Sequence, residues 1–394
     1  MKFDPALEIQ NFLVFGEFGD VNPSICDSST YTFLQANTMQ GVFEGDIEGC
    51  FLYSRQWNPT SRYLCQALSR MEGGEDAQVF ASGMAAISST LLELCSAGDE
   101  IICGRTVYGG TYALLANLLP RFGIKTHFVD LSDESAIEEK ISPATRLIYT
   151  ESVSNPLLEV MDLPKLAALC QKQSLKLVVD NTFCPMILSP LRLGADIAVY
   201  SMTKFINGSS DCIAGAAVGK KEFVKSLVDV NQGVGMLMGP VLDGFRAAGI
   251  LKNLHTLHCR MQKHSENALV LANYLEKVGL KVFYPGLTSH AGHSLLGKLM
   301  NSGYGYGGVL TVDLKTKAMA DQFMIKMQEN KVGYLAVSLG YFKTLFSAPG
   351  HSTSSEIPES DRLKMGISDG LVRISVGLDR DMHATWKLIE KCLP

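Results

Sequence analysis

Residues 195–211 read ADIAVYSMTKFINGSSD, a core-strand pattern that runs directly into a lysine. The segment up to Tyr200 is apolar enough to be buried, yet Lys204 follows only four residues later. A lysine is rarely buried unless its amine has a partner, and the ordinary alternative is a stem that packs while the amine reaches solvent. Small hydroxyl and amide residues surround this lysine, including Ser201 and Thr203. That setting favours a desolvated, nucleophilic amine.

The segment around Lys204 is one of several strand patterns that alternate with helical ones. The expected strands are AQVFA, EIICG, KTHFVDL, RLIYTE, LKLVVDN, DIAVYS and CIAGAAVG, between residues 77 and 219. The expected helices between them are GMAAISSTLLELC, TYALLANLL and DLPKLAALCQKQ. This alternation predicts an α/β fold with a mostly parallel sheet covered by helices on both faces. Ligands of such sheets bind at the carboxyl ends of the strands.

Composition and hydrophobic pattern change twice along the sequence and predict three parts. Residues 1–57 look like an irregular arm, residues 58–250 form the large α/β domain, and residues 251–394 form a smaller C-terminal α+β domain. In the last part we expect one long helix over 252–279, strands over 281–285, 307–314 and 371–378, and helices over 318–330 and 382–393.

Composition limits the class of protein. Of 394 residues, 46% are hydrophobic and 19% charged, which supplies a large core. The net charge is −5 and no dense Lys/Arg run occurs, so we expect no nucleic-acid partner. No signal-peptide pattern or membrane-spanning apolar run is present, and the ten cysteines lack metal-ligand spacing. We therefore expect a cytoplasmic, reduced protein without a metal site or a membrane partner.

Three further motifs could each have either a purely structural role or a role in ligand binding. In VFASGMAAISST, Ser82 is a natural N-cap and Gly83 permits close backbone approach, so the helix start is either an ordinary cap or an anion site. Asp180 ends the apolar strand of KLVVDNTF, where it could make a turn or pair with a cation. Asn155 in RLIYTESVSNP follows another strand and is typical of turns.

Together these motifs point to one cofactor. An anion site, a carboxylate and a lysine would meet at the carboxyl ends of strands in one domain. Pyridoxal phosphate requires such a set, since its phosphate, ring nitrogen and aldehyde need these three partners. Two other phosphate motifs fail, because no GxGxxG opens a helix and GAAVGKKE lacks P-loop spacing.

Eight motifs in order carry a family resemblance: YSRQWNPT, FASGMAAI, VYGGTYAL, ESVSNPLLEV, VVDNTF, YSMTKFINGSSD, AVSLG and VRISVGLD. From about residue 20 to its end, the chain resembles the Cys/Met-metabolism family of pyridoxal-phosphate enzymes. That family includes methionine γ-lyases, cystathionine lyases, cystathionine γ-synthases and acylhomoserine sulfhydrylases. The resemblance implies the PLP-dependent transferase fold type I, which is aspartate aminotransferase-like.

The resemblance also implies residue roles around the cofactor. Lys204 would hold it covalently, Asp180 would pair with the ring nitrogen, and Asn155 would bind the ring hydroxyl oxygen. The phosphate site would comprise Ser82, backbone N–H groups of Gly83 and Met84, and hydroxyls of Ser201 and Thr203.

The substrate and the neighbouring subunit account for the remaining roles that the resemblance implies. Tyr108 would stack on the ring and transfer protons, and Arg373 would clamp the substrate carboxylate with the Ser338 main chain nearby. Tyr53 and Arg55 would reach the phosphate of a neighbouring subunit from the arm. This implies shared active sites in a dimer, and a homotetramer built as a dimer of dimers.

The substrate expectation depends on a few positions. Ala113 stands where cystathionine enzymes carry arginine, and Lys343 stands where many of them carry glutamate, so a distal amine would be repelled. Tyr341 and Phe342 could favour a small apolar thioether, although Lys343 could equally point to solvent. The leading hypothesis is γ-elimination of L-methionine to 2-oxobutanoate, ammonia and methanethiol.

Other activities stay open at this point. Gly110 resembles cystathionine enzymes, and FGEFGD (15–20) and FSAPGHSTSSEIPE (346–359) depart from the family pattern. Lys343 is also similar to acylhomoserine sulfhydrylases. The alternatives are therefore cystathionine γ-lyase or γ-synthase activity, γ-replacement on an acylhomoserine, or an inactive scaffold. Joint retention of Lys204, Asp180, Tyr108 and Arg373 argues against the scaffold.

Overall fold

A seven-stranded sheet forms the centre of the computed structural model, which describes residues 3–13, 16, 19–44, 47, 49–352, 362 and 365–394. The strand order is β1-β7-β6-β5-β4-β2-β3. β7 runs antiparallel to both neighbours, and all other pairs are parallel. The mostly parallel α/β sheet is thus confirmed, and each strand overlaps a predicted one: β1 Asp76–Phe80, β2 Glu100–Gly104, β3 Lys125–Val129, β4 Thr145–Glu151, β5 Lys176–Asp180, β6 Ile197–Ser201 and β7 Gly215–Gly219.

Helices cover both faces of this sheet because its strands are apolar on both sides. Alternate side chains of a strand point to opposite faces. On β6, Ala198 and Tyr200 share a core with residues of α3 (Pro59–Glu72) and α10 (Gly244–Leu254). Ile197 and Val199 share a second core with residues of α4 (Gly83–Leu94). The helix α7 (Leu163–Lys172) packs on the α3 face, against β4 and β5.

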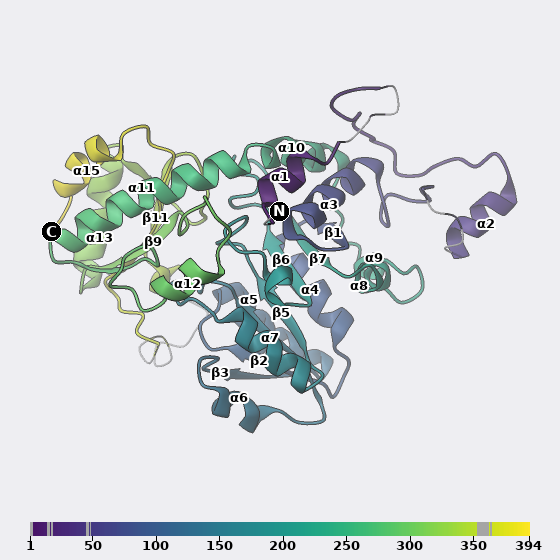
Figure 1. Ribbon diagram of the computed structural model, residues 1–394, viewed down its shortest axis with the longest axis horizontal. Helices are drawn as coiled ribbons and strands as arrows, with labels where there is room; N and C mark the ends of the chain where they lie inside the picture. Colours follow the sequence, from purple (N-terminus) through teal and green to yellow (C-terminus); the bar gives the residue numbers. More distant parts are fainter. Residues whose placement is uncertain are drawn as a thin grey trace.

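A second, five-stranded sheet lies at the end of the molecule that carries the C-terminus (Figure 1). Its order is β10-β11-β12-β9-β8, with only the β10–β11 pair parallel. The helices α11, α13 and α15 contribute to its core. Strands β10 and β11 were not predicted. The bounds are β8 Lys281–Phe283, β9 Val309–Asp313, β10 Gly333–Leu335, β11 Thr344–Ser347, β12 Leu371–Ser375, α11 Leu257–Lys277, α13 Lys317–Glu329 and α15 Met382–Glu390.

The long helix predicted over 252–279 is wrong in one respect, because the chain breaks it at His255 and Thr256. α10 ends at Leu254 and α11 begins at Leu257. The Asn253 carbonyl accepts a 2.8 Å hydrogen bond from Arg260 Nη2. The same guanidinium donates to the carbonyls of Phe205 and Ile206, directly after Lys204. The break therefore serves to hold the loop that carries the candidate lysine.

The helix predicted over 111–119 is also irregular. It begins as α5 (Gly109–Ala113) and continues as a π-helical turn (Leu114–Leu118) and a 3-10 turn (Leu119–Phe122). Four further short helices complete this list: α6 Glu134–Lys140, α8 Lys221–Leu227, α9 Val234–Met238 and α12 His293–Leu299. Two other 3-10 turns cover Pro190–Leu193 and Pro349–His351.

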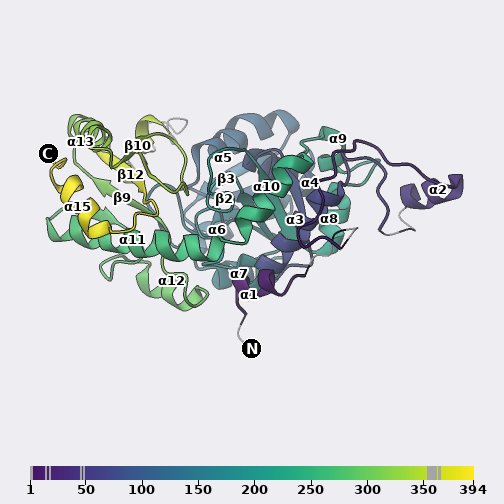
Figure 2. The same ribbon diagram turned by 90° about the horizontal axis from the view of Figure 1, so that it is seen from above.

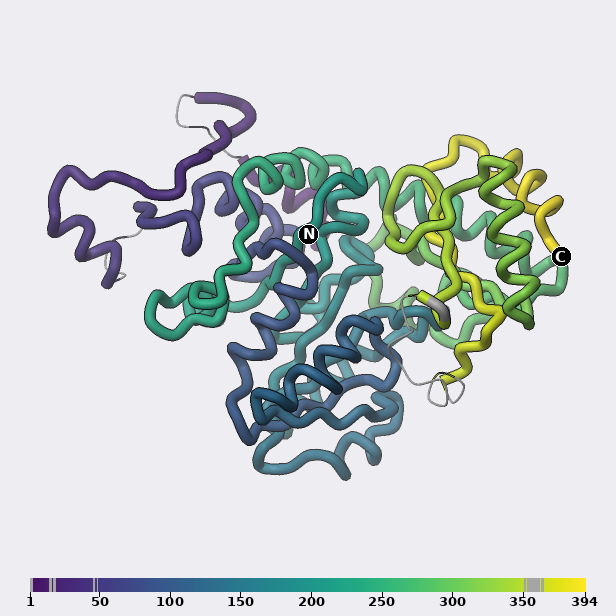
Figure 3. Tube along the Cα trace, turned by 180° about the vertical axis from the view of Figure 1, so that it is seen from behind, coloured from purple at the N-terminus to yellow at the C-terminus, as the bar shows by residue number. Residues whose placement is uncertain are grey.

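The first 57 residues contain two helices that the sequence reading did not expect, α1 (Pro5–Gln10) and α2 (Ala36–Glu44). α1 packs beside α3, whereas α2 projects outward in all three views (Figures 1, 2 and 3), with Glu44 at its end lining a hollow together with Asp229. α2 has no buried residue, and Leu34 and Val21 nearby are fully exposed. No residue from 19 to 44 is buried, so the apolar side chains of this segment are exposed or half-buried.

The predicted division into domains at 57/58 and 250/251 stays a prediction, and the second boundary falls inside α10. Half of FGEFGD (residues 15, 17 and 18) and residues 353–359 lie outside the described residues. Among the described residues, no helix is long and apolar enough to cross a membrane.

Gly215 tests how closely β7 approaches the start of α4. A Cβ at this position would lie 2.1 Å from the Ser82 carbonyl oxygen. We expect Gly215→Ala to lower the free energy of unfolding by about 1–3 kcal/mol, since backbone must move. The matched control is Gly249→Ala, on an exposed position of α10 with no atom within 4 Å. Denaturant titration should show the control unchanged or stabilised by about 0.5–1 kcal/mol. Equal stability of both variants would contradict the close approach.

Candidate active site

One cavity of about 450 Å³ gathers most of the candidate residues. It lies where β4, β5 and β6 end and α4 begins, and the loop between β10 and β11 and strand β12 close it from the second sheet. Such a position at the carboxyl ends of parallel strands is the usual ligand site of α/β sheets. Its lining comprises Ser82, Gly83, Met84, Ile87, Tyr108, Glu151, Val153, Asn155, Asp180, Thr182, Phe183, Ser201, Thr203, Lys204, Ile213, Val337, Ser338, Leu339, Ser352 and Arg373.

Lys204 is held inside this cavity rather than directed to solvent. Its Nζ donates a 2.9 Å hydrogen bond to Ser338 Oγ. Burial, and secondarily the charge of Arg373, lowers the pKa of Lys204 to about 8. A lysine with such a pKa is neutral in a large fraction of molecules near pH 8, and a neutral amine is a nucleophile and a base.

Asp180 ends β5 and is buried beside the same cavity. Its Oδ1 accepts from the Thr182 backbone N–H at 2.9 Å, and its Oδ2 accepts from the Tyr149 hydroxyl at 3.4 Å. Burial raises the pKa of Asp180, and the hydrogen bonds from Thr182 and Tyr149 oppose that rise. A carboxylate in this position would gain by pairing with a cationic ring nitrogen.

Glu151 is a cavity residue that the sequence reading missed. It ends β4, and its Oε1 and Oε2 accept the backbone N–H groups of Tyr108 and Asn155, each at 2.8 Å. Burial first, and then the charge of Asp180, raises the pKa of Glu151 to about 8. Glu151 thus fixes the backbone of two candidate residues. Its only sequence signal was its place at a strand end.

Arg373 enters the cavity from the second sheet, in the middle of β12. It is 4% exposed, with Nη1 donating to Asn155 Oδ1 at 3.0 Å and Nη2 donating to the Ser338 carbonyl at 3.4 Å. Burial lowers the pKa of Arg373 to about 10, against the opposing charges of Tyr108 and Glu151. A guanidinium at such a position could hold a carboxylate in two parallel hydrogen bonds.

The start of α4 is the candidate anion site. Ser82 caps the helix, and its Oγ accepts from the Ala85 N–H at 3.0 Å. A Cβ on Gly83 would lie 2.7 Å from Ser201 Cβ, so only glycine leaves room between helix and strand. The Thr203 hydroxyl exchanges hydrogen bonds with the Ala214 backbone, at 3.2 and 3.0 Å. Helix N–H groups in this position are suited to a phosphate.

Tyr108 lies at the mouth of the cavity with its side chain 40% exposed. A Cβ at position 110 would lie 2.5 Å from Tyr108 Cε1. Gly110, which departs from the expected methionine γ-lyase pattern, therefore permits this placement of the tyrosine ring.

Two groups of predicted residues do not line this cavity. Tyr53 and Arg55 lie on the arm, where the Arg55 guanidinium is 5.5 Å from the Tyr53 ring centre. Lys343 turns to Asp379, with Nζ 4.0 Å from Oδ1, and Phe342 is 56% exposed. The predicted repulsion of a substrate amine by Lys343 therefore has no geometric support here.

The expected apolar contacts from Tyr341 and Phe342 also fall outside the cavity. Tyr341 lines a neighbouring space of about 810 Å³, named here the outer hollow. The outer hollow shares Thr203, Ile213, Val337 and Ser338 with the cavity, and its other lining residues include Asp211, Asp243 and Arg246. Ala113 lines neither space.

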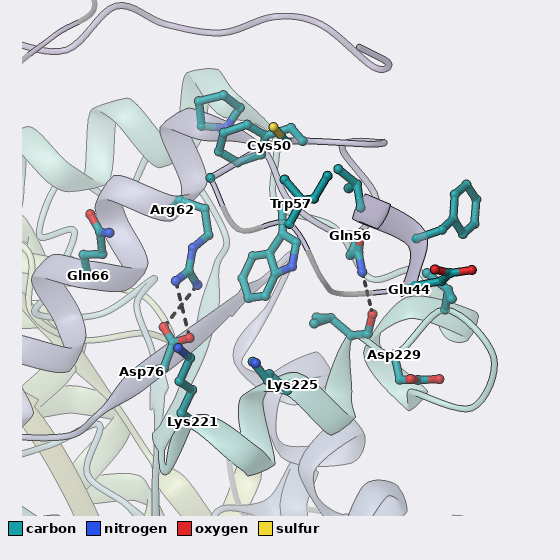
Figure 4. Close-up of a pocket in the computed structure, with 18 of the residues that line it drawn as sticks. Glu44, Cys50, Gln56, Trp57, Arg62, Gln66, Asp76, Lys221, Lys225 and Asp229 are labelled. Atoms are coloured by element: carbon teal, nitrogen blue, oxygen red, sulfur yellow. Dashed lines mark hydrogen bonds and ion pairs between the residues drawn. The ribbon is translucent and has the colours of Figure 1, made fainter. Parts of the chain in front are cut away.

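A third hollow, of about 570 Å³, lies at the root of the arm (Figure 4). Figure 4 shows Arg62 directed at Asp76, which its Nη1 contacts at 3.1 Å. Gln56 Nε2 donates to the Val228 carbonyl at 3.2 Å. The Arg62 guanidinium also lies 4.1 Å from the Trp57 ring centre. None of the candidate catalytic or cofactor residues lines this hollow.

Comparison with known proteins decides the family. The family model described as Cys/Met metabolism PLP-dependent enzyme matches residues 13–383. The chain belongs to this family. It is therefore a pyridoxal-phosphate-dependent enzyme, and the fold, the family and the cofactor predicted from the sequence are all confirmed.

Individual relatives differ in their reactions. A methionine γ-lyase of Arabidopsis thaliana is 43% identical, over 98% of this chain and 90% of the relative. An O-succinylhomoserine sulfhydrylase of Pseudomonas aeruginosa is 37% identical, over 92% of this chain and 88% of the relative. A crystal structure from Campylobacter jejuni, described as a candidate O-acetylhomoserine (thiol)-lyase, has a TM-score of 0.91 and 28% identity, covering 99% of both chains. That structure carries the pyridoxyl phosphate group on a lysine.

The cavity fits this cofactor by its own chemistry. Gly83 lets the start of α4 approach Ser201 closely, which brings the helix N–H groups and the Ser201 hydroxyl together for a phosphate, and Lys204 supplies a desolvated amine. The buried Asp180 carboxylate, whose pKa burial raises, lacks a cationic partner among the hydrogen bonds described above and would find one in the ring nitrogen. These residues therefore could hold pyridoxal phosphate.

The lowered pKa of Lys204 is open to direct measurement. In the cofactor-free enzyme, acylation of Lys204 by a neutral reagent should rise with pH and level off above about pH 9, because only the neutral amine reacts. Mass spectrometry of the peptide with Lys204 would follow it. Arg373→Leu should move the midpoint upward, since Arg373 disfavours a second positive charge. Arg146→Leu, which removes an exposed surface arginine, should leave it unchanged. A wild-type midpoint near that of an ordinary lysine would contradict the burial argument.

Proposed function

We propose that the protein is a carbon–sulfur lyase that eliminates the γ-substituent of L-methionine, releasing 2-oxobutanoate, ammonia and methanethiol. The distribution of charge in the cavity supports this most directly. The charged side chains among its described lining residues are Glu151, Asp180, Lys204 and Arg373. Each has a role near the cofactor or the α-carboxylate, which leaves none for a distal charge on the substrate.

The rest of the cavity wall is suited to an uncharged thioether. Val153, Phe183, Ile213, Val337 and Leu339 supply apolar surface. Cystathionine would place an ammonium and a carboxylate at its distal end, and succinylhomoserine would place a carboxylate there. Burying such a charge without a partner is costly, whereas a methylthio group gains from apolar contact.

The roles proposed for individual residues follow from their positions. Bound pyridoxal phosphate would supply the electron sink that stabilises a carbanion at the substrate α-carbon. Arg373 would hold the substrate carboxylate through its two Nη atoms, with Asn155 Oδ1 and the Ser338 carbonyl orienting the guanidinium. Asp180 would hold the ring nitrogen in its charged form. The start of α4 would hold the phosphate with Ser82, Gly83, Met84, Ser201 and Thr203.

Two side chains would move protons. Lys204 Nζ, once free, would remove the α-proton, and Ser338 Oγ at 2.9 Å offers its amine a second resting position. Tyr108 Oη would protonate the leaving thiolate from the mouth of the cavity, where Tyr108 is 40% exposed. Glu151 would keep the Tyr108 backbone in place through the 2.8 Å hydrogen bond to its N–H.

A product assay tests this activity. With methionine alone, the holoenzyme should release methanethiol and 2-oxobutanoate in equal amounts, and Lys204→Ala should lose turnover and the visible absorption of the bound cofactor. Cystathionine should be a poor substrate because its distal charges would be buried unpaired. If methionine is inert while an acylated homoserine plus a thiol gives a thioether, a γ-replacement enzyme is the correct assignment. A wild-type protein that binds no pyridoxal phosphate would favour a scaffold instead.

We also propose that the active site is completed by a second copy of the chain. Tyr53 and Arg55 lie on an arm that extends from the body, and the arm exposes Leu34, Phe43 and Val21. The outer hollow opens beside the anion site at Thr203 and carries Ile213, which is 62% exposed. An arm from a partner copy could cover this apolar surface and bring its Arg55 to the phosphate. A tetramer of two such dimers and a cytoplasmic location belong to the same proposal.

Subunit mixing tests the shared site. Arg55→Ala and Lys204→Ala should each be nearly inactive alone. After denaturation and refolding as a mixture, half of the dimers are hybrids with one intact site of two, so about a quarter of wild-type activity should return. Lys343 lines neither the cavity nor the outer hollow, so Lys343→Ala is the matched control. It should keep its activity alone and should not restore activity to the Lys204→Ala subunit in a mixture. No recovery in the mixture, with hybrids verified by mass, would show that each chain builds its own site.

A further inference from the structure

A buried polar chain runs along the sheet behind the cavity and joins four elements. It begins at Glu72, the last residue of α3, which is 1% exposed. The Tyr200 hydroxyl donates to Glu72 Oε2, and the Leu191 N–H donates to Glu72 Oε1 at 3.0 Å. Asn181 Nδ2 donates to the Tyr200 hydroxyl oxygen at 3.0 Å, and Ser152 Oγ donates to Asn181 Oδ1 at 2.7 Å.

Every residue of this polar chain is nearly or fully buried, and each one is hydrogen-bonded to the next. Tyr200 is 1% exposed, and Asn181 and Ser152 are 0% exposed. Asn181 Nδ2 also donates to the Leu188 carbonyl at 2.9 Å. Burial raises the pKa of Glu72 to about 8, and the hydrogen bonds from Tyr200 and Leu191 counteract that rise. Burying a carboxylic acid costs free energy, and so does burying a row of polar side chains unless every donor and acceptor is hydrogen-bonded. Apolar residues would avoid that cost, so we expect these side chains to have a function in the neighbouring cavity.

The positions of its members in the sequence suggest that function. Ser152 follows Glu151, Asn181 follows Asp180, and Tyr200 precedes Ser201. Glu151, Asp180 and Ser201 all line the cavity. Since neighbouring side chains of a strand point to opposite faces, the polar chain and the cavity residues occupy opposite faces of the same three strand ends.

The register of the sheet makes this relation regular. Glu151 pairs with Asp180, and Asp180 pairs with Val199, so Ser152, Asn181 and Tyr200 form the next row across β4, β5 and β6. Tyr200 packs in the core that contains α3, whereas Val199 packs in the core that contains α4. The polar chain thus ties the three strand ends to one another and to α3 from the side that never meets the ligand.

We propose that Glu72, Tyr200, Asn181 and Ser152 are positioning residues that fix the spacing of Glu151, Asp180 and Ser201 for the cofactor. Hydrophobic packing alone is non-directional and would tolerate small sliding of strand ends, whereas hydrogen bonds set distance and angle. A cofactor site of this kind works only when its residues are held within about 0.5 Å of the productive geometry. The inference rests on the proposed roles of Asp180 and Ser201 at the ring nitrogen and the phosphate.

Removal of one hydrogen bond of the polar chain should therefore weaken cofactor binding, although the polar chain lies on the face of the sheet opposite to the cavity. We expect Tyr200→Phe and Ser152→Ala each to raise the dissociation constant of pyridoxal phosphate from the cofactor-free enzyme by roughly tenfold, the equivalent of one buried hydrogen bond. Equilibrium dialysis against pyridoxal phosphate measures this without turnover. The KM for methionine should change less than the cofactor constant, because Arg373 lies on the other sheet.

Tyr284→Phe is the matched control. Tyr284 is also 0% exposed, and its hydroxyl donates to the Gly307 carbonyl at 2.9 Å; neither Tyr284 nor Gly307 lines the cavity. It should lower the melting temperature about as much as Tyr200→Phe while leaving the cofactor constant unchanged. The double variant Tyr200→Phe/Ser152→Ala should lose less than the sum of the two single effects, since both break one connected chain.

The results separate the inference from the proposed function. If Tyr200→Phe and Ser152→Ala behave as Tyr284→Phe does, the polar chain only stabilises the fold and the inference is wrong. Should Glu72→Gln or Tyr200→Phe fail to fold, Ser152→Ala at the far end still decides. If Lys204→Ala retains turnover, the proposed function fails first, whatever the cofactor constants of the other variants.

Discussion

Burial of two cations and two carboxylates in one cavity is the constraint on which the rest of the structure depends. Lys204 and Arg373 are basic side chains, and Glu151 and Asp180 are acidic ones, all within the same lining. Burial lowers the pKa values of both cations and raises those of both acids, so every one of these groups is less easily ionised than in water. Such a site is stable only when each group has a fixed partner.

Those partners come from two sheets that are far apart in the sequence. Arg373 on β12 reaches Asn155 after β4, and Ser338 accepts from both Lys204 and Arg373 through different atoms. Gly340, with φ +82°, lies against the Lys204–Phe205 backbone, where a Cβ would come within 2.6 Å of Phe205 N. Ser338 itself has φ +110°, an uncommon backbone state for a residue with a side chain. The loop between β10 and β11 is thus shaped by its contacts with the lysine.

Local pattern predicted the part of the site that the first sheet builds. Seven apolar strands with punctuated ends placed Lys204, Asp180 and Asn155 at one edge without any tertiary information. Arg373 and Ser338 could be assigned only through the family resemblance, because no local rule relates a second sheet to the first. Glu151 escaped notice since a glutamate at a strand end has no distinctive spacing, and the break at His255 depends on where the Arg260 side chain goes.

Lys343 shows why a single position is a poor guide to substrate. Its difference from cystathionine enzymes suggested a repulsive charge in the pocket, but its amine lies 4.0 Å from Asp379 Oδ1. That contact joins the end of the β10–β11 loop to the segment after β12, beside the 2.7 Å hydrogen bond from the Leu378 N–H to the Phe342 carbonyl. Lys343 does not line the cavity and is connected to it through the loop that carries Ser338. Under the proposed function, substrate choice would depend instead on the apolar wall of Val153, Phe183, Ile213, Val337 and Leu339, which lines the cavity itself.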